Sequence, residues 1–144
     1  MIDIQSHIVE FRNGESGKHV FHMDKVIQLL LDKIVQKTDK YPSLWQERIL
    51  IRTASALHDI GKIGIDEAIL NKPGRLTAEE FESMKAHTTI GADMLRNLPR
   101  YQEERILQIA IEICRWHHER YDGKGYPAVS YTHLRAHETR SNLV

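Results

Sequence analysis

Side chains that bind divalent metal ions occur at several separate points of the chain. The candidate ligands are Glu15, His19, the adjacent pair His58 and Asp59, the isolated His87, and the adjacent pair His117 and His118. Mixed imidazole and carboxylate ligands suit iron, manganese, zinc, cobalt or nickel. The single cysteine argues against a structural zinc site made of thiolates. The histidines therefore predict a centre that holds more than one metal ion.

Each of these residues also has a simpler explanation. A lone buried histidine is more often a hydrogen-bonded core residue than a ligand. Glu15 and His19 share one face if a helix has begun there, but a solvated pair of this kind is commoner than a ligand pair. The metal interpretation is favoured because the alternative leaves several polar groups to find separate partners inside a small core.

Clustered metal ions suit the hydrolysis of a phosphodiester, since they activate water and stabilise the attacking and leaving oxygens. Asp59 could bridge two ions, which makes it one candidate catalytic residue. Lys62 is the other, because its ammonium group could meet a phosphate oxygen. Lys62 could instead be a cation favourably placed just past the C-terminus of a helix.

Apolar residues recur at spacings of three and four along most of the chain, which predicts helices, and no alternating run of β-branched residues predicts a sheet. The first helix is expected over 16–38, with one apolar stripe. A capping box, Ser43 with Gln46, begins the second helix, which we expect Gly61 to end. The pair 58–59 then lies in the last turn of that helix.

A second capping box, Thr77 with Glu80, begins a helix that is expected to run without a break to about Leu95 and to turn His87 inward. The last helix is expected over 101–117. The candidate ligands therefore lie on helices or at their ends, and the helices must converge if the ligands are to meet.

The bulk composition predicts one globular domain with a core, since 28% of the 144 residues are charged and 41% are apolar. Basic and acidic residues cancel at 20 each, so nothing predicts a nucleic-acid polymer as a partner. No apolar run approaches the roughly 20 residues that a membrane-spanning helix needs. Cys114 is expected to be a buried small side chain. A single cysteine and no signal-peptide pattern make the cytoplasm the expected location.

Residues 129–144 do not share the helical pattern. One back-translation of residues 129–139 resembles the adapter used in transposase-based DNA library preparation, so we expect a non-native tail produced by adapter read-through. A genuine polar tail is the alternative. His133 and His137 are therefore left out of the site. Residues 1–14 are expected to be a linker from an upstream sensory or receiver domain.

Five runs appear in a fixed order: HDIGKIG (58–64), LNKPG (70–74), TAEEF (77–81), MKAH (84–87) and HHERYDGKGYP (117–127). Together they resemble the HD-GYP branch of the HD phosphohydrolase superfamily, over most of residues 15–128. The resemblance implies an all-α, HD-domain-like helical bundle. It also implies two or three divalent metal ions, with iron or manganese favoured, and hydrolysis of cyclic di-GMP to pGpG, GMP or both.

When the family's functional residues are carried over by position, the resemblance implies that all the candidate ligands named above bind metal. It also implies that Lys62 contacts the substrate phosphate. The residues expected to form the substrate-binding wall are Gly125, Tyr126 and Pro127. Tyr126 could instead be only a packed turn residue. Glu119 and Arg120 are expected to form a structural ion pair.

The chain departs from the family after the Gly-Tyr-Pro run, where family members continue into a helix with a further metal-binding Asp and ligand-contacting basic residues. We therefore expect the C-terminal helices of the bundle to be missing, at least one metal site to be incomplete, and this chain to be weakly active or inactive. Two alternatives stay open: a phosphohydrolase of another nucleotide, and a non-catalytic HD-type signalling module. Homodimerisation through the first helix is a further expectation.

Overall fold

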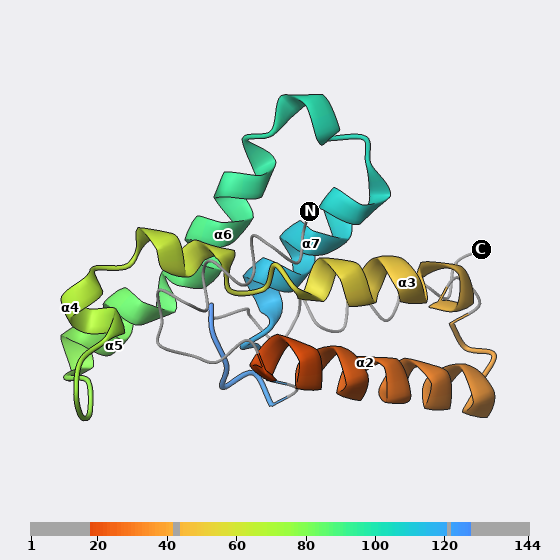
Figure 1. The fold of residues 1–144 in the computed structure, drawn as a ribbon, viewed down its shortest axis with the longest axis horizontal. Helices are drawn as coiled ribbons and strands as arrows, with labels where there is room; N and C mark the ends of the chain where they lie inside the picture. Colours follow the sequence, from red (N-terminus) through yellow and green to blue (C-terminus); the bar gives the residue numbers. More distant parts are fainter. Residues whose placement is uncertain (1–17, 42–43, 121, 128–144) are drawn as a thin grey trace.

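Helices form the whole framework of the computed structural model, which describes residues 18–41, 44–120 and 122–127 (Figure 1). In chain order they are α2 (Lys18–Lys37), α3 (Leu44–Ser55), the 3-10 helix η1 (Ile60–Gly64), α4 (Glu67–Leu70), α5 (Ala78–Lys85), α6 (His87–Arg96), the 3-10 helix η2 (Pro99–Tyr101) and α7 (Arg105–Trp116). No strand occurs within these ranges, which confirms the all-α prediction.

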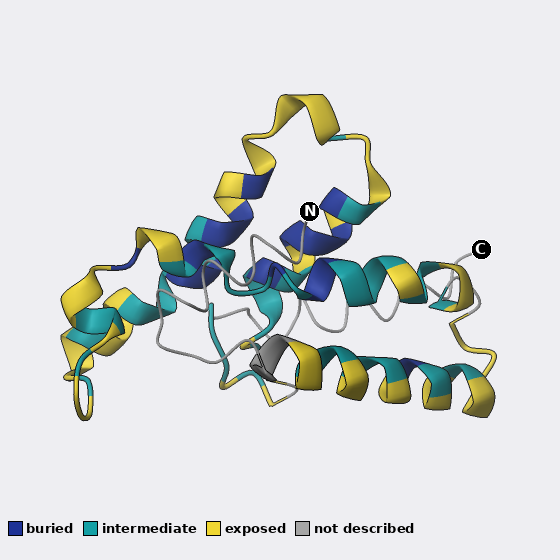
Figure 2. Cartoon of the chain, viewed as in Figure 1, coloured by how far each residue is buried: buried dark blue, intermediate teal, exposed yellow. Residues whose placement is uncertain are grey.

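The apolar core lies where α3, α6 and α7 meet. Its buried residues are Ala54, Leu57, Ala92, Leu95, Leu107, Ile109, Ala110, Ile111 and Cys114. Figure 2 shows buried residues gathered on α6, α7 and the end of α3 nearest them. Burying a Leu or Ile side chain stabilises a fold by roughly 1.5–3 kcal/mol. The core therefore fixes the relative positions of the three helices whose ends carry the site.

The helix α2 contributes little to this core. Leu31 is buried, whereas Val26, Leu29 and Leu30 are 54%, 65% and 57% exposed. Successive residues point about 100° apart around a helix, so the side of α2 that faces α3 cannot also bury these three residues. Only part of the apolar stripe predicted for this helix is therefore covered in the part of the chain that the structure describes.

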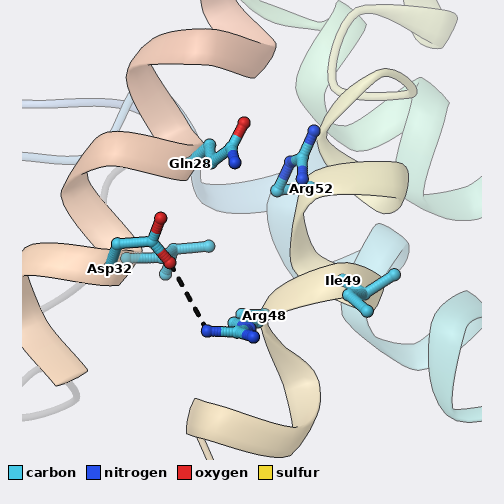
Figure 3. Close-up of a pocket in the computed structure, with 6 residues that line it drawn as sticks. Gln28, Asp32, Arg48, Ile49 and Arg52 are labelled. Atoms are coloured by element: carbon cyan, nitrogen blue, oxygen red, sulfur yellow. Dashed lines mark hydrogen bonds and ion pairs between the residues drawn. The ribbon is translucent and has the colours of Figure 1, made fainter.

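Two arginine–aspartate pairs join α2 to α3. Arg52 donates two hydrogen bonds to Asp24, at 2.9 and 2.8 Å, and Arg48 lies 3.5 Å from Asp32. Between the two helices lies a cavity of about 230 Å³ (Figure 3). A polar joint beside a cavity holds α2 less tightly than a packed apolar interface would.

The second helix ends earlier than the sequence predicts. α3 stops at Ser55, and the chain continues in tighter turns in which the amide of His58 donates to the carbonyl of Ser55 and that of Lys62 to the carbonyl of Asp59. Such bonds to the third preceding residue are those of a 3-10 helix. The prediction that 58–59 lies in the last turn of the helix is therefore wrong, and Gly61 lies within η1 instead of ending α3.

The third predicted helix is also divided. The Thr77–Glu80 capping box begins α5 as predicted, but the helix breaks at Ala86. The carbonyl of Met84 accepts a hydrogen bond of 2.7 Å from Nδ1 of the His87 ring, so a side chain occupies an acceptor that a continuous helix would use. The prediction of an unbroken helix is wrong for this reason, while the inward position of His87 is confirmed by its 1% exposure.

Cys114 is completely buried, as predicted, and its thiol donates to the carbonyl of Leu57. The last helix begins at Arg105 and not at Tyr101, which belongs to η2. The predicted cap at Ser43 lies outside the described residues. Among the helices that the structure describes, none has the length and apolarity required to cross a bilayer.

Candidate metal centre

Four of the candidate ligands come together at the ends of three different segments. Asp59 lies in the turn between α3 and η1, His87 begins α6, and the remaining two, His117 and His118, follow α7. One potential ligand atom from each of these residues lies within 4.8 Å of the others. The convergence that the sequence requires is therefore present.

The two carboxylate oxygens of Asp59 have different surroundings. Oδ2 lies 3.0 Å from Nε2 of His58 and 2.9 Å from the ammonium group of Lys62. Oδ1 is buried and makes no hydrogen bond within the described structure, although the Nε2 atoms of His87 and His117 lie 3.4 and 3.5 Å from it. Burying a carboxylate oxygen without a hydrogen-bond donor costs free energy unless a cation lies beside it.

The rings of His87 and His117 direct nitrogen lone pairs at each other. In each ring Nδ1 lies within hydrogen-bond distance of backbone carbonyls, at 2.7 Å for His87 and 3.0 Å for the shorter contact of His117. This pattern assigns the proton of the neutral ring to Nδ1 and leaves Nε2 as a lone-pair donor. The two Nε2 atoms are 3.2 Å apart. Two lone pairs this close, beside the orphan oxygen of Asp59, form a donor set that fits a divalent metal ion.

Charge and burial act on this group in opposite directions. Burial disfavours ionisation of Asp59, but the neighbouring His117, His58 and Lys62 outweigh it and hold the pKa of the carboxyl below its usual range. Burial lowers the pKa of His87 and, together with the neighbouring imidazoles, lowers the pKa of His118 to about 4. Asp59 is thus an anion and these two rings are neutral near pH 7, which are the protonation states that metal ligands require.

His58 lies beside the four-residue group. Its Nδ1 lies 2.9 Å from the carbonyl of Ser55, and its ring meets that of His117 edge-on with centroids 5.1 Å apart. Burial lowers its pKa, but Asp59 more than compensates, so the pKa of His58 is raised overall. His58 and Lys62 therefore both lie against the Asp59 carboxylate.

Glycines allow the segments of the centre to approach closely. A Cβ atom on Gly61 would lie 1.9 Å from the carbonyl oxygen of His87, which fixes η1 directly against α6. A Cβ atom on Gly125 would lie 2.4–2.6 Å from backbone atoms of His118, Glu119 and Arg120. The Gly-Tyr-Pro run thus lies directly on the segment that carries the second histidine pair, and no larger residue fits either position without movement.

Tyr126 is a packed residue at the edge of the centre. Its ring stacks on His118, with centroids 4.5 Å apart and an angle of 21° between the planes, and it meets Phe81 and His87 edge-on. Burial raises the pKa of its hydroxyl.

Lys85 was assigned no role from the sequence, and Glu119 differs from its predicted role. The ammonium group of Lys85 lies 5.5 Å from the ring centroid of Phe81 and 5.9 Å from that of Tyr126. Both carboxylate oxygens of Glu119 are buried without a hydrogen bond in the described ranges, because Arg120 pairs with Asp122 at 2.7 Å. The expected ion pair between Glu119 and Arg120 is therefore not formed. The position of Glu119 directly after the candidate ligand His118 is the sequence signal that could have placed its carboxylate near the centre.

Two predicted ligands cannot be placed. Glu15 lies outside the described residues, and His19 falls in the first turn of α2, where the side chains are not described. Their roles as ligands stay predictions.

Comparison with known proteins supports the same interpretation. The chain is 38% identical over 125 residues to a cyclic di-GMP phosphodiesterase of Vibrio cholerae, a match that covers 85% of this chain and 25% of that protein. It is 41% identical over 127 residues to a cyclic di-GMP phosphodiesterase of Thermotoga maritima, covering 88% of this chain and 32% of that protein. A 3'3'-cGAMP-specific phosphodiesterase 2 of Vibrio cholerae is 37% identical over 122 residues, covering 85% of this chain and 21% of that protein.

The chain thus spans between a fifth and a third of the length of these relatives. Residues 8–130 match the HD domain family, and this range contains all four converging ligands. The HD-GYP motifs, the helical fold and this match agree, and the chain belongs to the HD domain family.

Proposed function

We propose that this chain is part of a metal-dependent phosphodiesterase that hydrolyses cyclic di-GMP to pGpG, GMP or both. The observation that carries the proposal is the orphan oxygen of Asp59 facing the Nε2 atoms of His87 and His117. The names of the relatives from Vibrio cholerae and Thermotoga maritima support the choice of substrate.

The described residues would hold the metal ions through Asp59, His87, His117 and His118, with His58 beside them. His58, Glu15 and His19 are proposed as further ligands on the strength of the family resemblance. Bound divalent ions would supply Lewis-acid activation of water and charge stabilisation for the phosphoryl group. We propose two or three ions and favour iron or manganese.

Lys62 is proposed to bind the substrate phosphate. Its side chain is mostly buried and its ammonium group lies 2.9 Å from Oδ2 of Asp59, so it is held at the centre before any ligand arrives. A preorganised cation at this place can stabilise charge that develops on a phosphate oxygen. Asp59 contacts Lys62 through Oδ2 and leaves Oδ1 available for a metal ion. Metal binding and the placement of Lys62 therefore both depend on this residue.

The wall of the substrate site is proposed to include Gly125, Tyr126 and Pro127. Tyr126 lies within 6.3 Å of the His87 ring, measured between centroids, which puts this run at the border of the metal centre. The same site would accept other cyclic dinucleotides, and 3'3'-cGAMP is the second candidate because one relative is named as specific for it.

The remaining proposals concern the surroundings of the domain. Exposed Val26, Leu29 and Leu30 on α2 support homodimerisation through this helix. An upstream sensory or receiver domain, a non-native tail over 129–144 and a cytoplasmic location stay predictions from the sequence. A phosphohydrolase of another nucleotide and a non-catalytic signalling module are the outcomes that the assay below must separate.

The proposal is tested by incubating cyclic di-GMP and 3'3'-cGAMP with the Mn²⁺- or Fe²⁺-loaded protein under reducing conditions and separating the products. Because this chain spans a minor part of its relatives, a longer protein that contains it is assayed in parallel. We expect the longer protein to form pGpG or GMP and Asp59→Asn to abolish turnover with the fold intact. Metal binding without turnover of either dinucleotide in the longer protein would favour a phosphohydrolase of another nucleotide. The absence of both metal binding and turnover would favour the non-catalytic signalling module.

A further inference from the structure

Three of the four histidines at the metal centre are oriented by the backbone. Nδ1 of His58, His87 and His117 lies within 3.0 Å of a carbonyl oxygen three residues earlier in each case. A ligating histidine is normally held in this way, because a hydrogen bond at its other ring nitrogen fixes both the tautomer and the ring plane.

His118 lacks such an anchor. Neither of its ring nitrogens makes a hydrogen bond within the described ranges, and it is the exposed member of the four-residue group. The ring of His118 instead contacts three other aromatic rings. The ring of Tyr126 is stacked on it at 4.5 Å, whereas His117 is tilted by 46° at 4.2 Å and His87 is edge-on at 5.2 Å.

The loop that carries Tyr126 is fastened to the same segment. The amide of Tyr126 donates to the carbonyl of His118 at 3.2 Å, and Gly125 lies so close to the backbone of 118–120 that a Cβ atom would collide with it. Phe81 also contacts the tyrosine ring edge-on, with centroids 6.0 Å apart. Tyr126 is thus held at its backbone by the hydrogen bond to His118 and at its side chain by the contact with Phe81.

We propose that Tyr126 is the positioning residue of His118, and that its stacked ring does for this ligand what a backbone carbonyl does for the other three histidines. The inference rests on the proposed metal centre and extends it, since it gives the tyrosine of the Gly-Tyr-Pro run a task at a named ligand. The stack requires the aromatic face of Tyr126 and not its hydroxyl group.

The experiment compares Tyr126→Phe with Tyr126→Leu in the full chain. Mn²⁺ affinity is measured from the electron paramagnetic resonance signal of free Mn²⁺, and the His118 ring protons are followed by NMR without metal. We expect Tyr126→Phe to keep the Mn²⁺ dissociation constant within about twofold and Tyr126→Leu to raise it about 10-fold or more, as loss of an orienting partner does. The ring-current shift of His118 should persist in the first variant and vanish in the second.

Two further variants separate positioning from general destabilisation. Gly125→Ala should weaken Mn²⁺ binding in the same direction as Tyr126→Leu, because its Cβ atom forces the loop away from His118. Gly123→Ala is the matched control, since Gly123 has a φ of 70° but no atom within 4 Å of its added Cβ, so only backbone strain changes. Thr77→Ala removes the cap of α5 and should leave the Mn²⁺ affinity unchanged.

The inference is overturned if folded Tyr126→Leu binds Mn²⁺ as tightly as the wild type, or if Tyr126→Phe is as weak as Tyr126→Leu. If the wild-type chain binds no Mn²⁺, the proposed function fails. The NMR comparison still decides in that case whether Tyr126 orients His118, because it needs no metal.

Discussion

The Nε2 atoms of His87 and His117 lie 3.2 Å apart, and each ring presents its Nδ1 side to the backbone. Two imidazole nitrogens that point their lone pairs at each other at this distance repel each other unless a cation or a shared proton lies between them. The contact is therefore unfavourable without a cation, and a bound metal ion would relieve it and stabilise the fold.

Asp59→Asn should remove metal binding while it keeps the shape of the side chain. The amide cannot supply two anionic oxygens, one for the buried face of the centre and one for His58 and Lys62. We expect the Mn²⁺ affinity to fall by more than the roughly 10- to 100-fold typical of losing an outer-shell partner. Asp93→Asn, which alters an exposed ion pair with Arg96, is the matched control and should bind normally. Equal affinities of the two variants would contradict the assignment of Asp59.

Gly61→Ala should destabilise the fold by about 1–3 kcal/mol or more, the range for overpacking. Its Cβ atom would meet the backbone of His87 and Gly91, neither of which can turn aside. Gly64→Ala is the comparison, because its Cβ atom would meet only the side chain of Ile90, at 3.0 Å, and that side chain can adjust. Urea unfolding should rank the two variants in this order, and the opposite order would refute a close contact between η1 and α6.

The pair Asp24–Arg52 should make α2 sensitive to acid. Its hydrogen bonds with Arg52 hold the pKa of Asp24 below the ordinary value of 3.8. A carboxylate with a depressed pKa contributes stability above its unfolded pKa, and this contribution is lost as the pH falls below that value. Because both side chains are about one-third exposed, the pair is worth about 1 kcal/mol or less.

A double-mutant cycle with Asp24→Asn and Arg52→Met measures this coupling directly. At pH 7 the coupling energy should be small and favourable, and it should shrink as the pH falls below the ordinary value of 3.8 and the carboxyl of Asp24 is protonated. A coupling that does not change with pH would show that the two side chains contribute through packing alone.

Cys114 should be inert in the folded chain. Burial raises the pKa of its thiol to about 12, so on the order of one molecule in 10⁴ carries a thiolate at pH 8. A disulfide reagent added at pH 8 should react only as fast as the protein unfolds. Reaction at the rate of a free thiol, with the fold intact, would show that the core around α7 is open.

Local sequence signals predicted the framework well where one residue type has one strong structural preference. Thr77 with Glu80 began α5 as expected, and Cys114, which has apolar neighbours along the chain, is buried in the core as predicted. The position of His87 on the inner face of its helix also followed from spacing alone. Each of these features depends on neighbours within a few residues along the chain.

The end of the second helix and the break between α5 and α6 have causes that apolar spacing does not contain. η1 replaces the end of the second helix where Gly61 meets the carbonyl of His87, and α5 breaks from α6 where the ring of His87 takes the carbonyl of Met84. Both depend on segments that are distant in sequence or on a side chain that leaves its usual direction. The motif residues predicted which groups converge, but they could not predict that Arg120 would pair with Asp122 and leave the Glu119 carboxylate without a partner.

Asp59, His87, His117 and His118 should enclose a divalent metal ion when one is supplied. Anomalous diffraction from crystals grown with Mn²⁺ tests it most directly, with data collected on both sides of the manganese absorption edge. We predict a strong anomalous peak among Oδ1 of Asp59 and the histidine nitrogens, with the Nε2 atoms of His87 and His117 moved apart beyond their present 3.2 Å to admit the ion. If saturating Mn²⁺ produces no peak there and the two nitrogens stay in contact, these four residues do not form a metal centre.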